Sequence, residues 1–79
     1  MQIVELDIKL PYEGRGKILG RLFAMVRGRI RDIHFFPPDA EGFSEIKMEV
    51  VEDDTRGLLS ELRKIIKNGK VSLRVLSEA

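Results

Sequence analysis

The stretch of sequence best suited to bind a small ligand lies near the amino terminus and reads Tyr12-Glu13-Gly14-Arg15-Gly16-Lys17. Helical spacing of apolar residues follows it directly. Its two glycines therefore place backbone N–H groups at a helix N-terminus, where partial positive charge collects, and Arg15 and Lys17 add full positive charges. We predict a site for a carboxylate or phosphate made by Glu13, Gly14, Arg15, Gly16 and Lys17. Glycine before a helix is also ordinary turn geometry, and this alternative stays open.

Side chains that could serve as a general acid or base are few. His34 is the only histidine. It stands between Ile33 and Phe35, which the alternation of a strand directs inward, so His34 belongs on the outer side of that strand. An ordinary exposed histidine explains this position better than a metal ligand or a proton switch.

Carboxylates recur at alternate positions of two predicted strands, in a spacing that acid–base chemistry or a metal ion could use: Glu5, Asp7, Glu45 and Glu49. They share their face with Lys9, Lys47 and Arg74, so cross-strand charge pairing is the simpler explanation. The chain contains no serine-protease triad motif, no His-Glu-x-x-His and no Walker sequence. We predict no catalytic residue, no metal site and no cofactor, and hence a protein that is not an enzyme.

The elements that must position these residues are visible as a repeat. When the two halves are compared at an offset of forty positions, apolar residues coincide in two alternating segments, at 4–10 and 44–50. Helical spacing follows in both halves at the same offset, because Ile18, Leu19, Leu22, Met25 and Val26 correspond to Leu58, Leu59, Leu62, Ile65 and Ile66. A third pair of segments, containing Ile33 and Leu73, alternates again as strands do.

Turn residues agree with this order. Gly28 follows the first predicted helix, Asp53, Asp54 and Thr55 offer caps to the second, and 37–42 reads as a turn between the halves. Two β-α-β units joined by a hairpin give the ferredoxin-like βαββαβ arrangement, an α+β sandwich. We therefore predict one domain over residues 1–79, with a four-stranded antiparallel sheet, both helices on one face, and the Glu5 and Glu45 series on the other.

Charge is unevenly distributed along the chain, whose net charge is +1. The segment from Gly14 to Arg31 contains six bases and no acid, whereas the segment from Asp39 to Asp54 contains seven acids and Lys47 as its one base. This fold binds single-stranded RNA when its open sheet face carries stacking aromatics. Here that face carries Glu, Asp and Lys, so we do not expect RNA recognition there. A nucleic-acid binder that uses the basic first helix is the third alternative, ahead only of an enzyme.

The composition of the chain indicates the cellular environment in which we expect the protein. Charged residues make up 34% of the chain, against about 25% in an ordinary domain, and there is one Asn and one Gln, which is typical of thermophiles. The chain has no cysteine for a disulfide. The first ten residues lack the apolar run of a signal peptide, and no segment approaches the roughly 20 apolar residues of a membrane span. We expect a soluble cytoplasmic protein with no membrane partner.

The order of elements and the run from Gly14 to Ala24 resemble the ACT domain, whose first helix opens with an acid-Arg-Pro-Gly-Val-Leu type of motif and a Leu-Phe-Ala-like run. The segments 29–33 and 44–50 look like its second and third strands. The resemblance covers nearly the whole chain through degenerate motifs. It departs at the ligand motif: either Lys17 takes the place of the ligand-contacting glycine, or Gly16 is that glycine with one residue inserted. The resemblance implies a regulatory module that binds an amino acid or similar metabolite between two copies.

Assembly follows from the edge of the sheet. The strand from Arg29 to Phe36 is predicted to be an edge strand with unpaired backbone groups. Phe36 lies beside His34 on the outer face, where an apolar aromatic is typical of an interface. We predict a homodimer through this edge, with Arg29, Arg31, His34 and Phe36 as contact residues.

These observations favour one function and leave two others open. The first is a stand-alone ACT-like regulatory module, a homodimer that senses an amino acid or similar anionic metabolite and acts in trans on an enzyme or regulator. The second is a protein–protein assembly module without a small-molecule ligand. The third is the nucleic-acid binder that uses the basic first helix.

Overall fold

Six elements follow one another in the order β-α-β-β-α-β, as the repeat predicted. In the computed structural model, which describes residues 1–78, with Glu78 described in its backbone alone, they are β1 Gln2–Pro11, α1 Arg15–Val26, β2 Ile30–Phe35, β3 Phe43–Val51, α2 Thr55–Ile65 and β4 Lys70–Glu78. The predicted ferredoxin-like α+β fold is confirmed.

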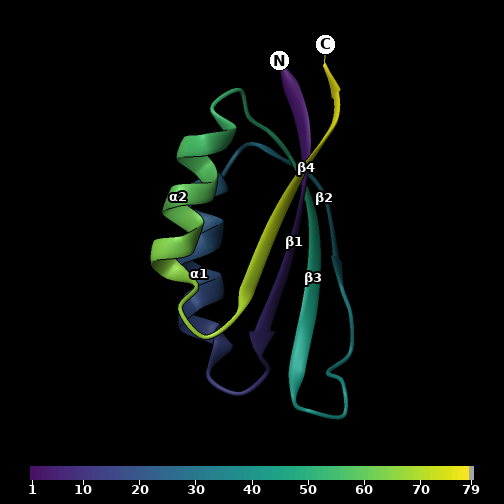
Figure 1. The fold of residues 1–79 in the computed structure, drawn as a ribbon, viewed down its shortest axis with the longest axis vertical. Coiled ribbons are helices and arrows are strands. Elements are labelled where there is room, and N and C mark those ends of the chain that lie inside the picture. The colour runs from purple at the N-terminus through teal and green to yellow at the C-terminus, as the bar shows by residue number, and fades with distance from the viewer. Residues whose placement is uncertain (79) are drawn as a thin grey trace.

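The four strands form one antiparallel sheet in the order β2-β3-β1-β4, so β2 and β4 are its edges. Leu6 at the centre of β1 lies opposite Met48 of β3 and Leu73 of β4. Both helices cover the same side of this sheet and run side by side, while the other side stays open (Figure 1). The two ends of the chain come together at one end of the sheet (Figure 1).

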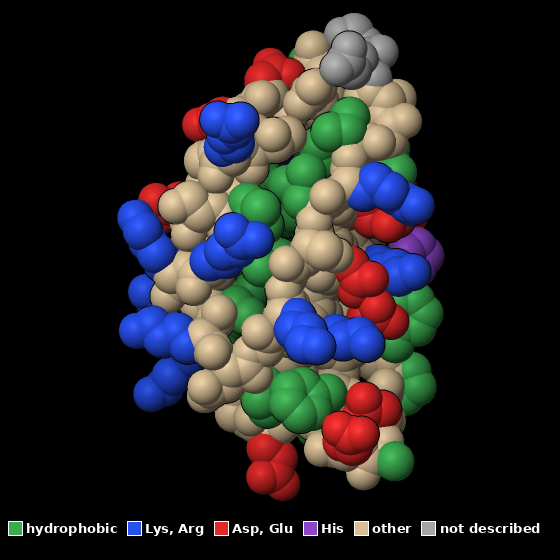
Figure 2. All heavy atoms as spheres, in the orientation of Figure 1, with side chains coloured by type: hydrophobic (Ala, Val, Ile, Leu, Met, Phe, Trp, Pro, Cys, Tyr) green, Lys and Arg blue, Asp and Glu red, His purple; other side chains and the backbone are tan. Residues whose placement is uncertain are grey.

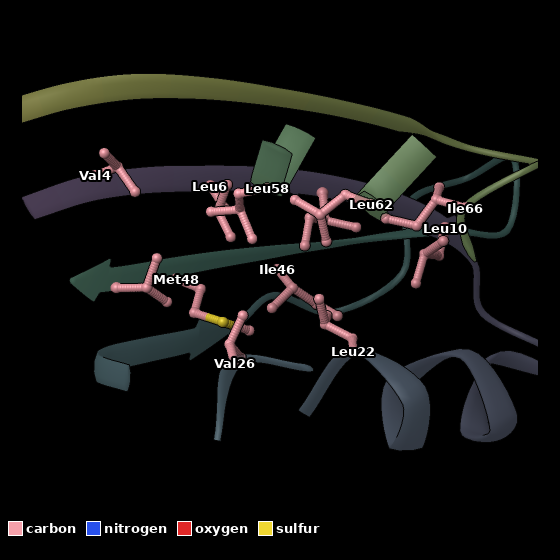
Figure 3. Packing of buried hydrophobic residues seen from close by; sticks show 12 residues of the cluster. Val4, Leu6, Leu10, Leu22, Val26, Ile46, Met48, Leu58, Leu62 and Ile66 are labelled. Atoms are coloured by element: carbon pink, nitrogen blue, oxygen red, sulfur yellow. The ribbon is translucent and has the colours of Figure 1, made fainter. Parts of the chain in front are cut away.

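The core lies between the sheet and the two helices, and Figure 3 shows side chains from both layers pointing toward one another. The alternation of β1 and β3 and the helical stripes supply all of its buried apolar residues: Val4, Leu6, Ile8, Leu10, Leu22, Val26, Ile46, Met48, Val50, Leu58, Leu62 and Ile66. Each is at most 5% exposed, so the period-two and 3.6-residue patterns identified the buried faces correctly.

The hairpin between the halves is held by one aspartate. The Oδ1 atom of Asp39 accepts hydrogen bonds from the N–H groups of Glu41 and Phe43, both at 2.9 Å. The N–H of Tyr12 donates to the carbonyl oxygen of Gly42 at 2.8 Å, which ties the end of β1 to this hairpin. The segment before α1 and the β2–β3 hairpin therefore lie at the same end of the molecule. Within residues 1–78, neither helix is long and apolar enough to span a membrane.

Candidate functional site

The predicted ligand-binding segment forms the junction between β1 and α1. Gly14 is the residue at the N-cap of α1 and has φ 77°, a left-handed conformation that favours glycine because a Cβ atom would strain it. Within the described residues, no side chain caps this end of α1 and its first turn contains no acidic residue. Glu13, Gly16 and Lys17 are exposed. The helix therefore begins with N–H groups that no side chain of the described chain satisfies.

Arg15 belongs to the same junction, but its side chain is occupied. Its Nη1 atom donates a hydrogen bond to Ser44 Oγ at 2.8 Å, and its guanidinium lies 4.5 Å from the centre of the Tyr12 ring. Ser44 is 1% exposed and in turn donates to the carbonyl oxygen of Leu10 at 3.4 Å. Arg15 therefore holds the start of α1 against the start of β3. Its charge remains near the N-terminus of α1, while Lys17 is the cation whose side chain is free in solvent.

The four predicted contact residues lie on β2 or next to it, since β2 spans Ile30–Phe35 and Arg29 and Phe36 flank it. The first two, Arg29 and Arg31, differ in their surroundings. Arg29 forms an ion pair with Glu52, and its Nη2 atom donates to the carbonyl oxygen of Met25 at 2.6 Å. It therefore joins the end of α1 to the segment after β3. Arg31 is exposed and lies where the register of β2 against β3 shifts, between Ile30 and Asp32.

The other two, His34 and Phe36, lie on the open face of the sheet, as predicted. His34 stands opposite Lys47, and the Nζ atom of Lys47 is 5.9 Å from the centre of the Phe36 ring. The Nε2 atom of His34 lies 3.0 Å from Asp32 Oδ2. Phe36 is 41% exposed. These side chains are accessible along the β2 edge.

Asp32 was not identified from the sequence, although it acts directly on the open edge. Its Oδ1 atom accepts the N–H of Ile33 at 2.9 Å. The N–H of Phe36 donates to the carbonyl oxygen of Glu45 on β3. Successive N–H groups of a strand point to opposite edges of it, so the N–H of Ile33, three residues earlier, faces away from β3. Asp32 thus covers one donor of the edge. The sequence signal that could have identified Asp32 is its place two positions before His34 on the same predicted strand.

The exposure of Phe35 was also underestimated from the sequence. The alternation placed it inward, and it does lie on the helix side, where its ring meets Phe23 of α1 edge-on at a centroid distance of 6.4 Å and an angle of 78°. It is nevertheless 50% exposed, because the helix layer does not extend over the β2 edge. The edge therefore presents one aromatic residue on each face of the sheet.

The carboxylates of the open face are partly paired across strands. Arg74 donates to Glu5 at 3.0 Å, and Asp7 stands opposite Lys47. Pairing is incomplete, because Glu5 also stands opposite Glu49 and the buried Asp7 Oδ1 atom has no hydrogen-bond partner within the described residues. Among residues 1–78 there is no group of three or more His, Asp or Glu side chains arranged to hold a metal ion.

Asp7 also acts on Glu45. The hydrogen bond that a protonated Glu45 can share with Asp7, burial, and the negative charge of Asp7 all raise the pKa of Glu45 above its ordinary value. The positive charges of Lys47 and Lys9 oppose this shift. A proton on Glu45 would let it donate to the Asp7 carboxylate, which explains why the proton is held more tightly in the folded protein.

The surface is hollowed elsewhere. A hollow of about 480 Å³ lies at the start of β4 and is lined by Asp7, Lys9, Arg63, Lys70, Val71 and Ser72. None of these residues belongs to the segment 13–17, so the candidate junction is not part of this hollow. Two cations of the hollow, Lys9 and Lys70, stand opposite each other on neighbouring strands.

The fold and this junction define a small ferredoxin-like α+β protein, and comparison with known proteins agrees at the level of the fold. No protein-family model matches the chain, and no curated protein matches it in sequence. The uncharacterized protein TM1266 from Thermotoga maritima is similar over 96% of this chain and 98% of its own, with a TM-score of 0.77 and 20% identity.

Two further solved structures share the fold over part of their length. An unknown protein from Galdieria sulphuraria matches 99% of this chain and 46% of its own, with a TM-score of 0.72 and 11% identity. A formyltetrahydrofolate deformylase from Pseudomonas putida matches 96% of this chain and 29% of its own, with a TM-score of 0.67 and 16% identity. At these identities the similarity establishes the fold.

Proposed function

We propose that this protein is an ACT-like regulatory module that works as a homodimer, senses an amino acid or similar anionic metabolite, and acts in trans on an enzyme or regulator. The single observation that carries the proposal is the start of α1. There Gly14 opens the backbone, no side chain of the described residues caps the helix, and the cation Lys17 points into solvent. A carboxylate bound at this position would satisfy free N–H groups and meet the positive end of the helix dipole.

The ACT-like assignment combines the sequence resemblance with the fold. In the formyltetrahydrofolate deformylase the matching region is 29% of a longer enzyme chain. A unit of this fold thus exists beside other parts of an enzyme. We propose that here the corresponding unit acts on a separate protein.

Dimerisation would use the β2 edge. Phe36 on the open face and Phe35 on the helix side are 41% and 50% exposed, and pairing of two β2 edges would bury both. Arg31 and His34 would contribute contacts, while Arg29 would position the start of β2 through its pair with Glu52. The carboxylate of Asp32 would have to leave the Ile33 N–H for the strands to pair.

A thermal-shift screen of amino acids and small organic acids tests the sensing role. A ligand at a hundred times its Kd stabilises the folded state by about 2.7 kcal/mol, which corresponds to a rise in Tm of roughly 10 °C or more for a chain of this size. The variant Lys17→Ala should reduce that rise, whereas Lys67→Ala, an exposed lysine just after α2, should leave it unchanged. Absence of any ligand response, or equal loss in both variants, contradicts the proposal.

The second candidate is an assembly module without a small-molecule ligand. The exposed Phe35 and Phe36 favour it, because they lie at an unpaired strand edge irrespective of any ligand. Sedimentation equilibrium of the wild type and of Phe36→Ser separates the candidates. A dimer that Phe36→Ser dissociates, in a protein with no ligand response, supports pure assembly, and a dimer with a ligand response supports sensing.

A further inference from the structure

The solvent side of the helix layer collects basic residues from both halves of the chain. Six exposed cations, which we call the basic helix surface, lie on α1, on α2 or in the two residues that follow α2: Lys17, Arg21, Arg56, Arg63, Lys64 and Lys67. The two helices contain one acidic residue between them, Glu61. Figure 2 shows blue side chains gathered along the side of the molecule that the helices form.

These cations are largely unneutralised by the protein itself. Within residues 1–78, Lys64 has one ion pair, with Glu61 at 3.4 Å, and both side chains are more than half exposed. The other five make no ion pair with the described residues. Exposed pairs of this kind contribute little, so the surface presents close to its full positive charge to solvent.

The shape of the surface allows close approach. A shallow hollow of about 460 Å³ on α2 is lined by Arg56, Leu59, Ser60, Arg63 and Lys64. On α1 the cations alternate with Gly16 and Gly20, and a Cβ atom at either glycine would meet nothing within 4 Å. The packing of the protein therefore does not require these glycines, and they leave the backbone of α1 accessible beside Lys17 and Arg21.

The chemistry of the surface distinguishes between classes of partner. A protein interface needs an apolar centre, and a membrane-surface helix needs an exposed apolar face. The large apolar side chains that are exposed among the described residues all lie outside the two helices: Met1, Tyr12, Ile30, Phe35, Phe36, Val75 and Leu76. Phosphate groups of a nucleic acid need only cations and hydroxyl or amide donors, which this surface offers.

From this geometry we infer that the basic helix surface binds the phosphate backbone of a nucleic acid without reading its sequence. The open sheet face, with its mixed charges, is not used, and this separates the site from that of RNA-binding proteins that stack bases on the sheet. The cations that α1 contributes to this surface, Lys17 and Arg21, would be too few for such binding. The fold combines them with those of α2, which begins forty residues later.

Fluorescence anisotropy with a labelled DNA duplex, a single-stranded RNA and a polyglutamate peptide, each titrated over a range of salt concentrations, tests the inference. The logarithm of the association constant for the nucleic acids should fall linearly with the logarithm of the salt concentration. Its slope should be about −3 or steeper for duplex DNA, because each neutralised phosphate contributes about −0.9. The duplex and single-stranded arms show which form is preferred.

Matched variants locate the surface. Arg21→Glu/Arg63→Glu, with one change on each helix, should lower nucleic-acid affinity at least tenfold and flatten the salt slope by about 2. Lys9→Glu/Arg74→Glu changes the net charge equally on the open sheet face and should leave affinity within about twofold, since those residues lie outside the surface. Melting curves confirm that each variant is folded.

Three results would overturn the inference. The first is no binding to either nucleic acid at low salt. The second is equal loss of affinity in the helix and sheet variants, which would indicate a response to net charge alone. The third is polyglutamate binding as tight as that of the nucleic acids and equally sensitive to Arg21→Glu/Arg63→Glu, which would indicate an acidic protein partner instead.

Discussion

The two halves of this chain place a helix after a strand in the same way, yet they begin those helices differently. At the start of α2, Asp54 is the N-cap, and its Oδ1 atom accepts the N–H of Gly57 at 2.9 Å. At the corresponding position of the first half stands Gly14, which has no side chain to cap α1 and adopts a left-handed conformation instead. The position of Gly57 corresponds to that of Lys17.

This difference shows that the architecture does not require a free helix start. A side-chain cap stabilises a helix by about 1 kcal/mol, and the second half has one. The first half lacks the cap, and its cation Lys17 stands at the position where the second half has Gly57, the residue whose N–H donates to the cap. The two junctions therefore serve as controls for each other, since they share a fold position and differ in whether a ligand could reach the helix N-terminus.

A second pair of equivalent positions diverges on the open face. Glu5 of β1 meets Arg74 at 3.0 Å, whereas Glu45 of β3 meets the carboxylate of Asp7, which raises its pKa. Equivalent positions in the repeat thus differ in their partners: Glu5 pairs with a cation, whereas Glu45 lies beside a second carboxylate as well as Lys9 and Lys47. The reason is that β1 is flanked by β3 and β4, whereas β3 is flanked by β1 and β2.

The largest effect is expected at Gly14. Gly14→Ala should lower the free energy of unfolding by about 1–2 kcal/mol, because alanine is strained in the left-handed region although the space around it is open. Gly16→Ala, two residues later in ordinary helical geometry, should instead stabilise the protein by up to about 1 kcal/mol. Urea unfolding measures both. Equal effects of the two substitutions would show that the backbone at Gly14 is not special.

Removal of the side-chain cap of α2 should have a smaller effect on the free energy of unfolding, and the effects of changes at Asp54 and Gly57 should depend on each other. Asp54→Ala should cost about 1 kcal/mol of unfolding free energy. A Cβ atom at Gly57 would lie 2.2 Å from Asp54 Oδ2, so Gly57→Ala should displace the cap and fail to stabilise the helix.

In the Asp54→Ala background the same Gly57→Ala change should stabilise the protein by roughly 0.5–1 kcal/mol, the ordinary advantage of alanine over glycine in a helix. A double-mutant cycle by chemical denaturation measures this change of sign. Additive effects at the two positions would contradict the cap as described.

The smallest effect concerns Glu45 and depends on pH. Because its pKa is raised in the folded state above the ordinary 4.5, the unfolded state releases the proton more readily, and the wild type loses stability as pH rises from 4.5 through the folded pKa. Glu45→Gln should therefore stabilise the protein above that window and have little effect below it. Thermal melts across pH provide the measurement.

Glu5→Gln is the matched control at the equivalent position of the repeat. It removes the exposed pair with Arg74 and should change stability in the opposite direction, by about 0.2–1 kcal/mol. A stabilising effect of Glu5→Gln at neutral pH that equals that of Glu45→Gln would mean that the two positions do not differ.

Much of the fold could be predicted because its signals are local. The alternation in the four strands and the helical stripes of α1 and α2 assigned every element. Asp54 was one of three cap candidates, with Asp53 and Thr55, and the structure shows that it is the N-cap. The exposure of Phe35 could not be predicted in this way, since alternation gives the face of a strand and not whether a helix covers it. The bond from Ile33 to Asp32 escaped prediction because the direction of an N–H depends on which neighbour the strand pairs with.

By itself the sequence determined the elements, their order and their buried faces, because hydrophobic periodicity acts over a few residues and needs no knowledge of distant parts. The tertiary structure decided the partners of the charges. Arg15 was expected to face a ligand and contacts Ser44, twenty-nine residues away, while Arg29 pairs with Glu52, twenty-three residues away. It also brought the cations of two distant helices onto one surface. Hydrogen bonds and Coulomb interactions depend on distance in space, and only the folded sheet sets that distance.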